Sequence, residues 1–210
     1  RRAVTELGHL GGTIPPNVDG VDLNDERFDP LWAEAVRLDV PISVHWGNGS
    51  YLHAAGTERF DTHFMVHAVG HPFEQMLAVA SMICGGVFER FPALRAGFLE
   101  AGCGWVPFWL ERLHEHWERR GAELPQLARD PMEYVAKGHC YFSAEPDEHL
   151  VPVAAEVAGA DHLLFASDYP HSDSAFPEAV KSLTSRDDVP ADVVSKMLHD
   201  NAVSYYGLQN

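Results

Sequence analysis

The sequence is poor in cysteine and in positive charge, and it has no long apolar run. Its three cysteines, Cys84, Cys103 and Cys140, include no CxxC pair, so neither a disulfide framework nor a zinc knuckle is expected, and the reducing cytoplasm is the predicted compartment. Only 15 Lys and Arg oppose 31 Asp and Glu, and a formal charge of −16 argues against binding to nucleic acid or to an anionic membrane. No apolar run approaches the roughly 20 residues that a membrane-spanning helix needs.

The remaining composition suits one globular domain. Of the 210 residues, 46% are hydrophobic and 22% are charged, so residues 1–210 are predicted to form a single domain with a sizeable core. Short apolar runs alternate with longer amphipathic stretches, which predicts repeated βα units on a parallel sheet. The predicted strands cover 11–17, 41–47, 94–102, 140–145 and 162–167. The predicted helices cover 28–40 with Asp29 as N-cap, 72–88 beginning at Pro72, 106–121, 130–135 with Asp130 at its start, 149–159 and 190–207.

Three of the predicted strands are followed by a reactive side chain at the carboxyl end. These are His45 after "ISV", Glu100 after "GFL" and Asp168 after "LLFAS". Ligands bind at this end of parallel α/β folds, so the three side chains are expected to converge. Imidazole and carboxylate groups suit zinc, iron or manganese, and a carboxylate beside such a metal can accept a proton from bound water. The pattern predicts a divalent metal site with all three as ligands, and Asp168 and Glu100 as catalytic groups.

Each of these residues also has a purely structural interpretation. His45 can be a hydrogen-bonded residue at the rim of the core. Glu100 lies in an apolar context, where an unpaired carboxylate is costly, and it can be neutralised by an arginine such as Arg112. Asp168 precedes a Tyr-Pro turn that it can simply cap.

Histidines spaced four apart precede the second predicted helix. His63, His67 and His71 would line one face of a helix and form a ladder of ligands. Gly70 interrupts this run, and the residue before Pro72 is disfavoured in helical conformation. We therefore predict that His71 is a helix-start or pocket residue that contacts substrate. Six other histidines are expected to be solvated: His114, His116, His139, His149, His162 and His199.

Two tryptophans and one cysteine lie near the predicted strand ends. Trp46 follows His45 directly, and Trp105 lies at a strand-to-helix turn, so both are predicted to form pocket walls that bind substrate. Cys103 follows Glu100 closely, which raises the alternative of a thiol nucleophile. Because no His and Asn partners accompany it in the sequence, a free and partly buried cysteine is favoured.

Three stretches resemble a known enzyme family. "PISVHWG", "GGVFERFPALRAGFLEAGCGWVPFWLERL" and "LLFASDYPH" are together similar to the amidohydrolase-related family, in the branch that includes aminocarboxymuconate semialdehyde decarboxylase. The resemblance implies a (β/α)8 barrel that holds a divalent metal at its carboxyl-terminal face. It further implies that His45 is the metal-binding residue after strand five and Asp168 the metal-binding, proton-accepting residue after strand eight. Tyr169 and His171 then lie in the loop beside the site, and His171 is predicted to bind substrate.

The sequence departs from this family pattern in two places. The decarboxylase has a catalytic histidine after strand six, where this chain has Glu100, which the resemblance then makes a metal ligand or a residue that orients substrate. The family pair spaced His-x-His on strand one has no counterpart, because by this resemblance the sequence begins near strand four. We expect a C-terminal portion of the barrel, about strands four to eight, with half of a metal site.

The resemblance favours a metal-dependent hydrolase that acts on a small organic substrate through metal-activated water. The first alternative is a metal-dependent decarboxylase on the same scaffold, and a carboxylate-rich iron site that activates oxygen is another. A non-catalytic barrel subunit is the alternative of a different class. The sequence leaves open the substrate, the choice among zinc, iron and manganese, and whether the protein is a homo-oligomer.

Overall fold

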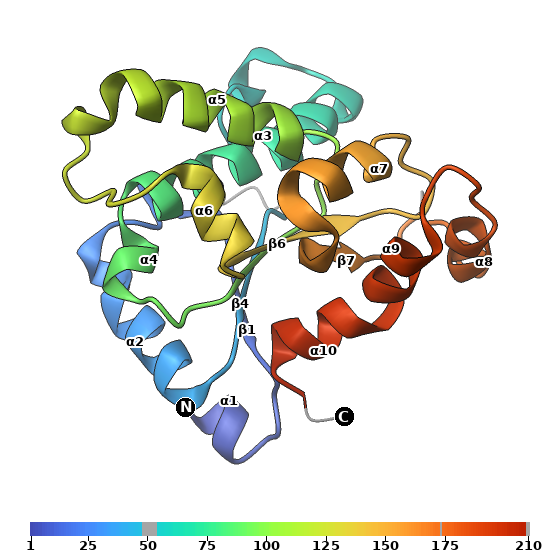
Figure 1. Ribbon diagram of the computed structural model, residues 1–210, viewed down its shortest axis with the longest axis horizontal. Helices are drawn as coiled ribbons and strands as arrows, with labels where there is room; N and C mark the ends of the chain where they lie inside the picture. The colour runs from blue at the N-terminus through green and yellow to red at the C-terminus, as the bar shows by residue number, and fades with distance from the viewer. Residues whose placement is uncertain (48–53, 173, 209–210) are drawn as a thin grey trace.

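The sheet contains the five strands that the sequence predicts. The computed structural model describes residues 1–47, 54–172 and 174–208. Its parallel strands lie in the order β1-β4-β5-β6-β7, which follows the chain order (Figure 1). Their bounds are β1 (Gly12–Ile14), β4 (Ile42–His45), β5 (Ala96–Leu99), β6 (Cys140–Ala144) and β7 (Leu163–Phe165). This is the α/β arrangement predicted for strands four to eight of a barrel.

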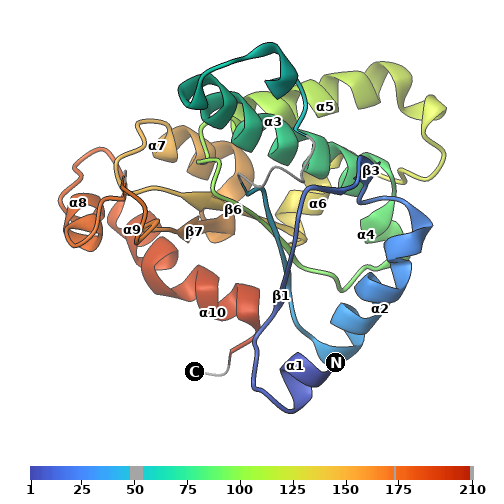
Figure 2. The ribbon, with the colours of Figure 1, turned by 180° about the vertical axis from the view of Figure 1, so that it is seen from behind.

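Helices connect successive strands and pack around the sheet (Figures 1 and 2). Their bounds are α1 (Arg2–Thr5), α2 (Asp29–Leu38), α3 (His63–Cys84), α4 (Val87–Arg90), α5 (Val106–Arg120), α6 (Pro131–Ala136), α7 (Val151–Ala154), α8 (Ala179–Thr184), α9 (Ala191–Ser195) and α10 (Asn201–Tyr206). A π-helical turn at Lys196–Asp200 joins α9 to α10 in one continuous segment. In the described ranges, no helix has the length and apolarity that crossing a membrane requires.

A short antiparallel ribbon follows β1 and was not predicted. It pairs β2 (Asn17–Val18) with β3 (Val21–Asp22). Gly20 has a φ of 75°, a backbone conformation that glycine adopts at little cost. The side-chain oxygen of Asn17 accepts a hydrogen bond from the Gly20 N–H at 3.0 Å and closes the turn. This local side-chain hydrogen bond helps the chain to reverse so soon after Pro15 and Pro16.

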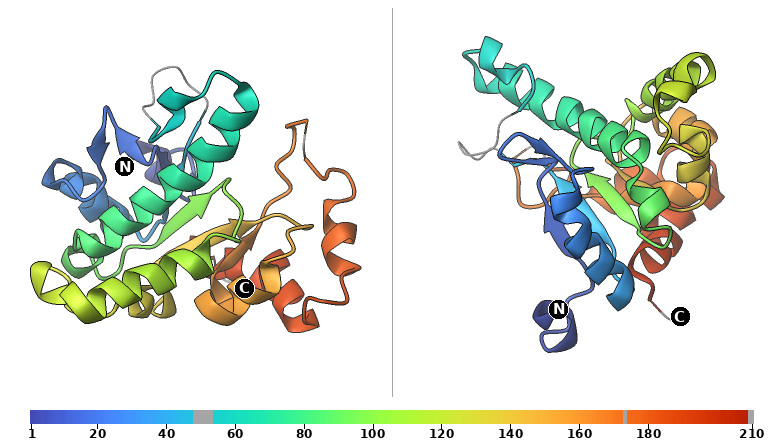
Figure 3. Two further views of the ribbon diagram at one scale, coloured as in Figure 1. Left: turned by 90° about the horizontal axis from the view of Figure 1, so that it is seen from above. Right: turned by 90° about the vertical axis from the view of Figure 1, so that its left-hand side faces the viewer.

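The two faces of the sheet have different coverings. Val44, Phe98 and Phe142 are fully buried in the main core, on the face against which α3, α5 and α6 pack (Figure 3). Because side chains alternate along a strand, Ser43 and Tyr141 point to the opposite face. That face is where the C-terminal segment lies.

Helix α10 covers part of this second face. Tyr205 is fully buried, and its hydroxyl lies 3.0 Å from Ser43 Oγ in a side-chain hydrogen bond. Gly97 makes room for the ring, since a Cβ at this position would lie 2.6 Å from the Tyr205 hydroxyl oxygen. Arg95 Nε donates to the Tyr205 carbonyl at 2.9 Å and holds the helix end in place. The helix therefore closes one part of the face and leaves the carboxyl ends of the strands accessible.

Helix α3 begins nine residues earlier than predicted, at His63 instead of Pro72. Thr62 caps it by accepting a hydrogen bond from the Met65 N–H at 3.4 Å. Gly70 does not interrupt the helix but allows close packing, because a Cβ there would lie 2.6 Å from Cη2 of Trp46. Proline removes one helical hydrogen bond, and the burial of this helix against the strands offsets that loss. The prediction of a helix start at Pro72 was therefore wrong.

The two capping predictions had different outcomes. Asp130 caps α6 as predicted, since its carboxylate accepts a hydrogen bond from the Met132 N–H at 2.9 Å. Asp29 is the first residue of α2, and Phe28 occupies the N-cap position. The Asp29 carboxylate instead accepts hydrogen bonds from Arg90, the nearest at 3.0 Å, because a long-range ion pair is available there.

Two of the histidines expected to be solvated are buried. His139 stacks on Phe88 with ring centroids 5.1 Å apart, and His162 packs edge-on against Tyr141. The residues next to them in the sequence do not distinguish a core position from a surface position. Only the packing of the folded chain shows that both histidines are buried. Burial lowers the pKa of both imidazoles below the ordinary value of 6.5.

We expect Gly97→Ala to destabilise the protein by about 1–3 kcal/mol, because the added methyl overlaps the Tyr205 ring and forces repacking. Urea unfolding measures the free-energy change. Gly47→Ala is the matched control, since a Cβ at Gly47 meets no atom within 4 Å. Equal stability of Gly97→Ala and wild type would contradict the placement of α10 on this face.

We expect the free energy of unfolding to fall as the pH drops from about 7 to 5. His139 and His162 have lower pKa values in the folded protein, so the unfolded chain binds more protons over this range. Their contribution is fully present above pH 6.5 and is lost as the pH falls below it. A double variant, His139→Asn with His162→Asn, should show a shallower pH dependence in urea unfolding. The exposed His116→Asn should retain the wild-type slope, and an unchanged slope in the double variant would refute this assignment.

Candidate metal centre

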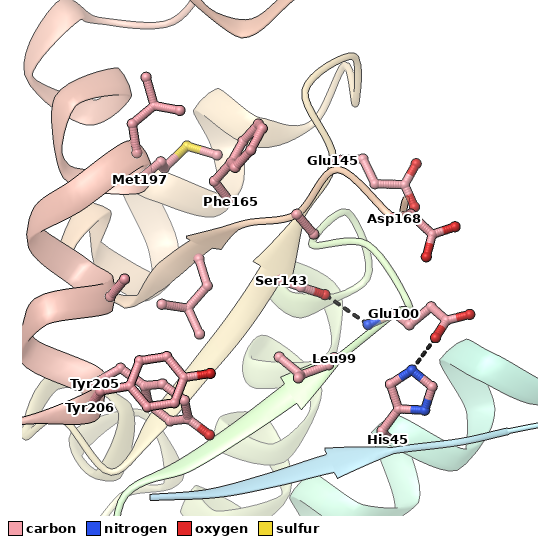
Figure 4. A pocket seen from close by; sticks show the side chains of 14 residues that line it. His45, Leu99, Glu100, Ser143, Glu145, Phe165, Asp168, Met197, Tyr205 and Tyr206 are labelled. Carbon is pink, nitrogen blue, oxygen red and sulfur yellow. Dashed lines mark hydrogen bonds and ion pairs between the residues drawn. The ribbon is translucent and has the colours of Figure 1, made fainter. Parts of the chain in front are cut away.

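The three predicted ligand residues line one cavity at the carboxyl ends of the strands. His45 is the last residue of β4, Glu100 follows β5 directly, and Asp168 follows β7 by three residues. The parallel register pairs His45 with Leu99, which places Glu100 next to the imidazole. All three border a cavity of about 320 Å³, and Figure 4 shows their side chains on the same side of it. The expected convergence is confirmed for these positions.

The backbone at the two acidic residues is strained. Glu100 and Asp168 both have a φ of 57°, in the left-handed region that residues other than glycine adopt infrequently. Such a conformation costs of order 1–3 kcal/mol and is concentrated at functional sites. Here it turns the chain sharply after β5 and β7, so that each carboxylate lies at the cavity.

Hydrogen bonds from neighbouring elements hold the strand ends. Gln75 on α3 is fully buried, and its Nε2 donates to the carbonyls of Val44 at 3.0 Å and Leu99 at 2.9 Å. These are the residues immediately before His45 and Glu100. The Glu100 N–H donates to Ser143 Oγ on β6 at 2.8 Å, as Figure 4 shows.

Histidines surround the carboxylate of Glu100. His45 Nε2 makes a direct ion pair and hydrogen bond with Oε2 of Glu100 (Figure 4). Glu100 Oε1 lies 3.9 Å from His71 Nε2 and 3.9 Å from His171 Nδ1. Arg112, the alternative partner, pairs with Glu115 at 3.4 Å instead. The half-buried carboxylate is therefore neutralised by imidazoles and not by an arginine.

These contacts shift the pKa values of the groups involved. Burial raises the pKa of the Glu100 carboxyl, but the hydrogen bond and charge of His45 and the neighbouring imidazoles outweigh this effect, so the net pKa lies below the ordinary value. The hydrogen bond with Glu100 raises the pKa of His45. Burial lowers the pKa of His71, which favours its neutral, ligand-competent form.

Asp168 has both a turn role and a site role. Its carbonyl accepts a hydrogen bond from the His171 N–H at 3.0 Å, which closes the turn after β7. Its Oδ1 lies 2.9 Å from His171 Nδ1, and its carboxylate borders the cavity. The alternative of a turn residue is thus correct for the backbone, while the side chain borders the cavity.

Among the described residues there are two sets of three side chains that could hold a metal ion. Within each set, one donor atom from each residue lies within 4.8 Å of the other two. One group contains Glu100, Asp168 and His171, and the other contains His67, His71 and Glu100. His45 contacts Glu100 but belongs to neither group. Carboxylate oxygens with imidazole nitrogens suit zinc, manganese or iron, so these donor sets fit a divalent cation. His67 was not predicted to be a ligand, because Gly70 and Pro72 argued against one continuous helix through this region.

Other predicted substrate-binding residues occupy different positions. His71 lines a second cavity, of about 330 Å³, that also borders Glu100 and Asp168. Trp46 is buried and packs edge-on against His71, with ring centroids 4.6 Å apart. Trp105 donates a hydrogen bond to the Gly102 carbonyl and packs in the core. Neither indole lines these two cavities, so direct contact between the tryptophans and a substrate stays a prediction.

The structure agrees with the sequence about Cys103 and adds Glu145 to the residues that border the cavities. Cys103 is buried, and burial together with Glu148 raises the pKa of its thiol, which disfavours a thiol nucleophile. Glu145 borders both cavities and was not predicted. It follows β6 directly, so the rule that identified Glu100 would also have identified Glu145.

Comparisons with known proteins identify the family of this chain. The family model described as Amidohydrolase matches residues 1–208. A 2-amino-3-carboxymuconate-6-semialdehyde decarboxylase from Dictyostelium discoideum is 32% identical over 173 residues, which cover 81% of this chain and 46% of that protein. Decarboxylase orsB from Emericella nidulans is 30% identical over 182 residues, covering 80% of this chain and 52% of that protein. The chain thus spans about half the length of these curated relatives.

Solved structures show the same fold. An amidohydrolase from Mycobacterium avium subsp. paratuberculosis superimposes with a TM-score of 0.79 at 26% identity, covering 99% of this chain and 55% of that one. A 5-carboxyvanillate decarboxylase from Novosphingobium aromaticivorans, solved with manganese and 4-hydroxy-3-methoxy-5-nitrobenzoic acid, gives a TM-score of 0.78 at 21% identity and covers 99% and 59%. The family match over nearly the whole chain shows that this protein belongs to the amidohydrolase family.

Proposed function

We propose that the protein is a divalent-metal-dependent decarboxylase that acts on a small carboxylated substrate. The observation that carries the proposal is the convergence of His45, Glu100 and Asp168 at one cavity. The sequence predicted hydrolysis first and decarboxylation as an alternative. The names of the curated relatives favour decarboxylation. The left-handed backbone at both Glu100 and Asp168 directs their carboxylates to the cavity, and such strain is frequent at functional sites, which favours an enzyme over a non-catalytic subunit.

His45, Glu100 and Asp168 are the proposed metal ligands, and His171 supports Asp168 through its Nδ1 contact. A divalent cation bound there would polarise a carboxylate or hydroxyl oxygen of the substrate. The manganese in the Novosphingobium structure supports manganese, while the imidazole and carboxylate donors of this chain also suit zinc.

The cavity suits a small and partly apolar compound. Leu99, Leu164, Phe165 and Met197 line it. Figure 4 shows Phe165 and Met197 on the side away from Glu100 and His45. An apolar wall with a few polar groups at one end is the usual form of a small-molecule site. Such a wall excludes water from the substrate carbon while the carboxylate faces His45 and Glu100.

Asp168 and His171 are the proposed proton carriers. When the bond between the substrate carbon and its carboxylate breaks, the electron pair stays on that carbon, and a proton must replace the departing CO₂. The Asp168–His171 pair, at 2.9 Å, can hold this proton and exchange it with water, because His171 is 59% exposed in its side chain.

We expect His45→Gln and Asp168→Asn to weaken metal binding at least tenfold, because each replaces a strong ligand by a neutral amide oxygen that binds divalent cations weakly. Metal content after dialysis against Mn²⁺ or Zn²⁺, measured by mass spectrometry, gives the stoichiometry and affinity. Release of CO₂ from hydroxybenzoates and carboxymuconate-type acids gives the activity, which a chelator should abolish and Mn²⁺ restore. His116→Gln on the exposed side of α5 is the control. Unchanged metal affinity in both variants would remove the ligand assignment.

We expect Gln75→Met to weaken metal binding by about 10-fold, because it releases the strand ends that carry His45 and Glu100. It should also destabilise the fold by about 1–3 kcal/mol, since two buried carbonyls lose a donor. Gln126→Met is the matched control, because Gln126 Nε2 also donates to a backbone carbonyl, that of Cys84, away from the site. A metal titration in which the two variants behave alike would reject a positioning role for Gln75.

A further inference from the structure

Helix α3 presents two imidazoles to the cavity beside the proposed centre. His67 and His71 are four residues apart, so they lie one turn apart on the same helix face. Their ring centroids are 4.6 Å apart. Pairs of histidines at this helical spacing bind zinc in other proteins because both rings reach one cation.

Glu100 supplies a third donor from across the cavity. Its Oε1 lies 3.9 Å from His71 Nε2, and one donor atom from each of His67, His71 and Glu100 lies within 4.8 Å of the other two. Ligand atoms around tetrahedral zinc are about 3.4 Å apart, given metal distances of about 2.1 Å, so a small contraction would bring the three to bonding geometry. Two histidines and one glutamate form a known catalytic zinc set that leaves the fourth position open.

The surroundings of His71 support a ligand role. The side chain is 7% exposed, and its Nδ1 is buried with no hydrogen-bond partner among the described residues. A buried polar nitrogen in this state carries a desolvation cost, which disfavours a charged ring. The neutral imidazole directs its other nitrogen, Nε2, toward Glu100. Trp46 packs edge-on against the ring and fixes its orientation, and Gly70 allows this close packing.

The cavity is accessible and negatively charged. Beyond the trio, it is bordered by the carboxylates of Glu145, Glu148 and Asp168. Glu148 is already engaged, since its Oε2 accepts the N–H of Cys103 at 2.8 Å. Glu145 and Asp168 add negative charge beside the open position, which favours the entry of a cation.

We propose that His67, His71 and Glu100 form a second divalent-cation site, adjacent to the first and sharing Glu100 with it. The inference rests on the proposed function only through Glu100, whose two oxygens can serve two cations. Paired metal ions bridged in this way lie about 3.5–4 Å apart in other enzymes. A cation held by His67 and His71 would add positive charge where the carboxylate of a substrate enters.

The test is the metal stoichiometry of the purified protein with Zn²⁺, and with Co²⁺ as a spectroscopic probe. Wild type should bind two equivalents, and His67→Ala should bind one and lose one set of visible Co²⁺ absorption bands. His67→Asp, which keeps a ligand atom, should restore the second equivalent. His63→Ala is the matched control, because His63 lies one turn earlier on α3 and stacks on His67 without belonging to the trio; it should bind two equivalents.

Asp168→Asn separates this inference from the proposed function. This variant should lose the metal ion of the first site and retain the metal ion whose binding depends on His67. One equivalent in wild type, unchanged in His67→Ala, would overturn the second site. A single equivalent lost in both His67→Ala and Asp168→Asn would also overturn it and leave one shared site. Loss of an equivalent in His67→Ala but in neither Asp168→Asn nor His45→Gln would support the second site and refute the first.

Discussion

The parallel pairing of β4 with β5 is the constraint on which the site depends. Their register places His45 opposite Leu99, so the residue after each strand reaches the same edge of the sheet. Gln75 reinforces this alignment from the helix side by donating to both strands at once. A slip of one residue would reverse the faces of one strand and separate the imidazole from Glu100.

Glu100 is the electrostatic centre of this edge. A half-buried carboxylate is costly without partners, and here its partners are imidazoles, which can give way to a metal cation. The left-handed backbone of Glu100 and Asp168 shows that the fold accepts local strain to aim both carboxylates at the cavity. Core packing on the other face of the sheet supplies the stability that offsets this strain.

The last helix gives the cavity its second wall. Tyr205 packs against Ser43 and Gly97 on the face opposite the main core, and Met197 also lines the cavity. The same segment therefore closes the sheet face and supplies the apolar half of the proposed substrate site. This arrangement links the stability of α10 to the shape of the cavity.

The sequence by itself determined the strands and the residues that follow them. Apolar runs ending in His45, Glu100 and Asp168 predict the site because every parallel strand delivers its next residue to one edge. Local patterns failed where distant contacts override local preference. Gly70 and Pro72 read as the boundary of a helix, yet Gly70 is required by the indole of Trp46, and α3 runs through both. Only the tertiary structure decided that His67 lies beside Glu100, that His139 is buried and that Gln75 holds two strands, because each depends on residues far away in the chain.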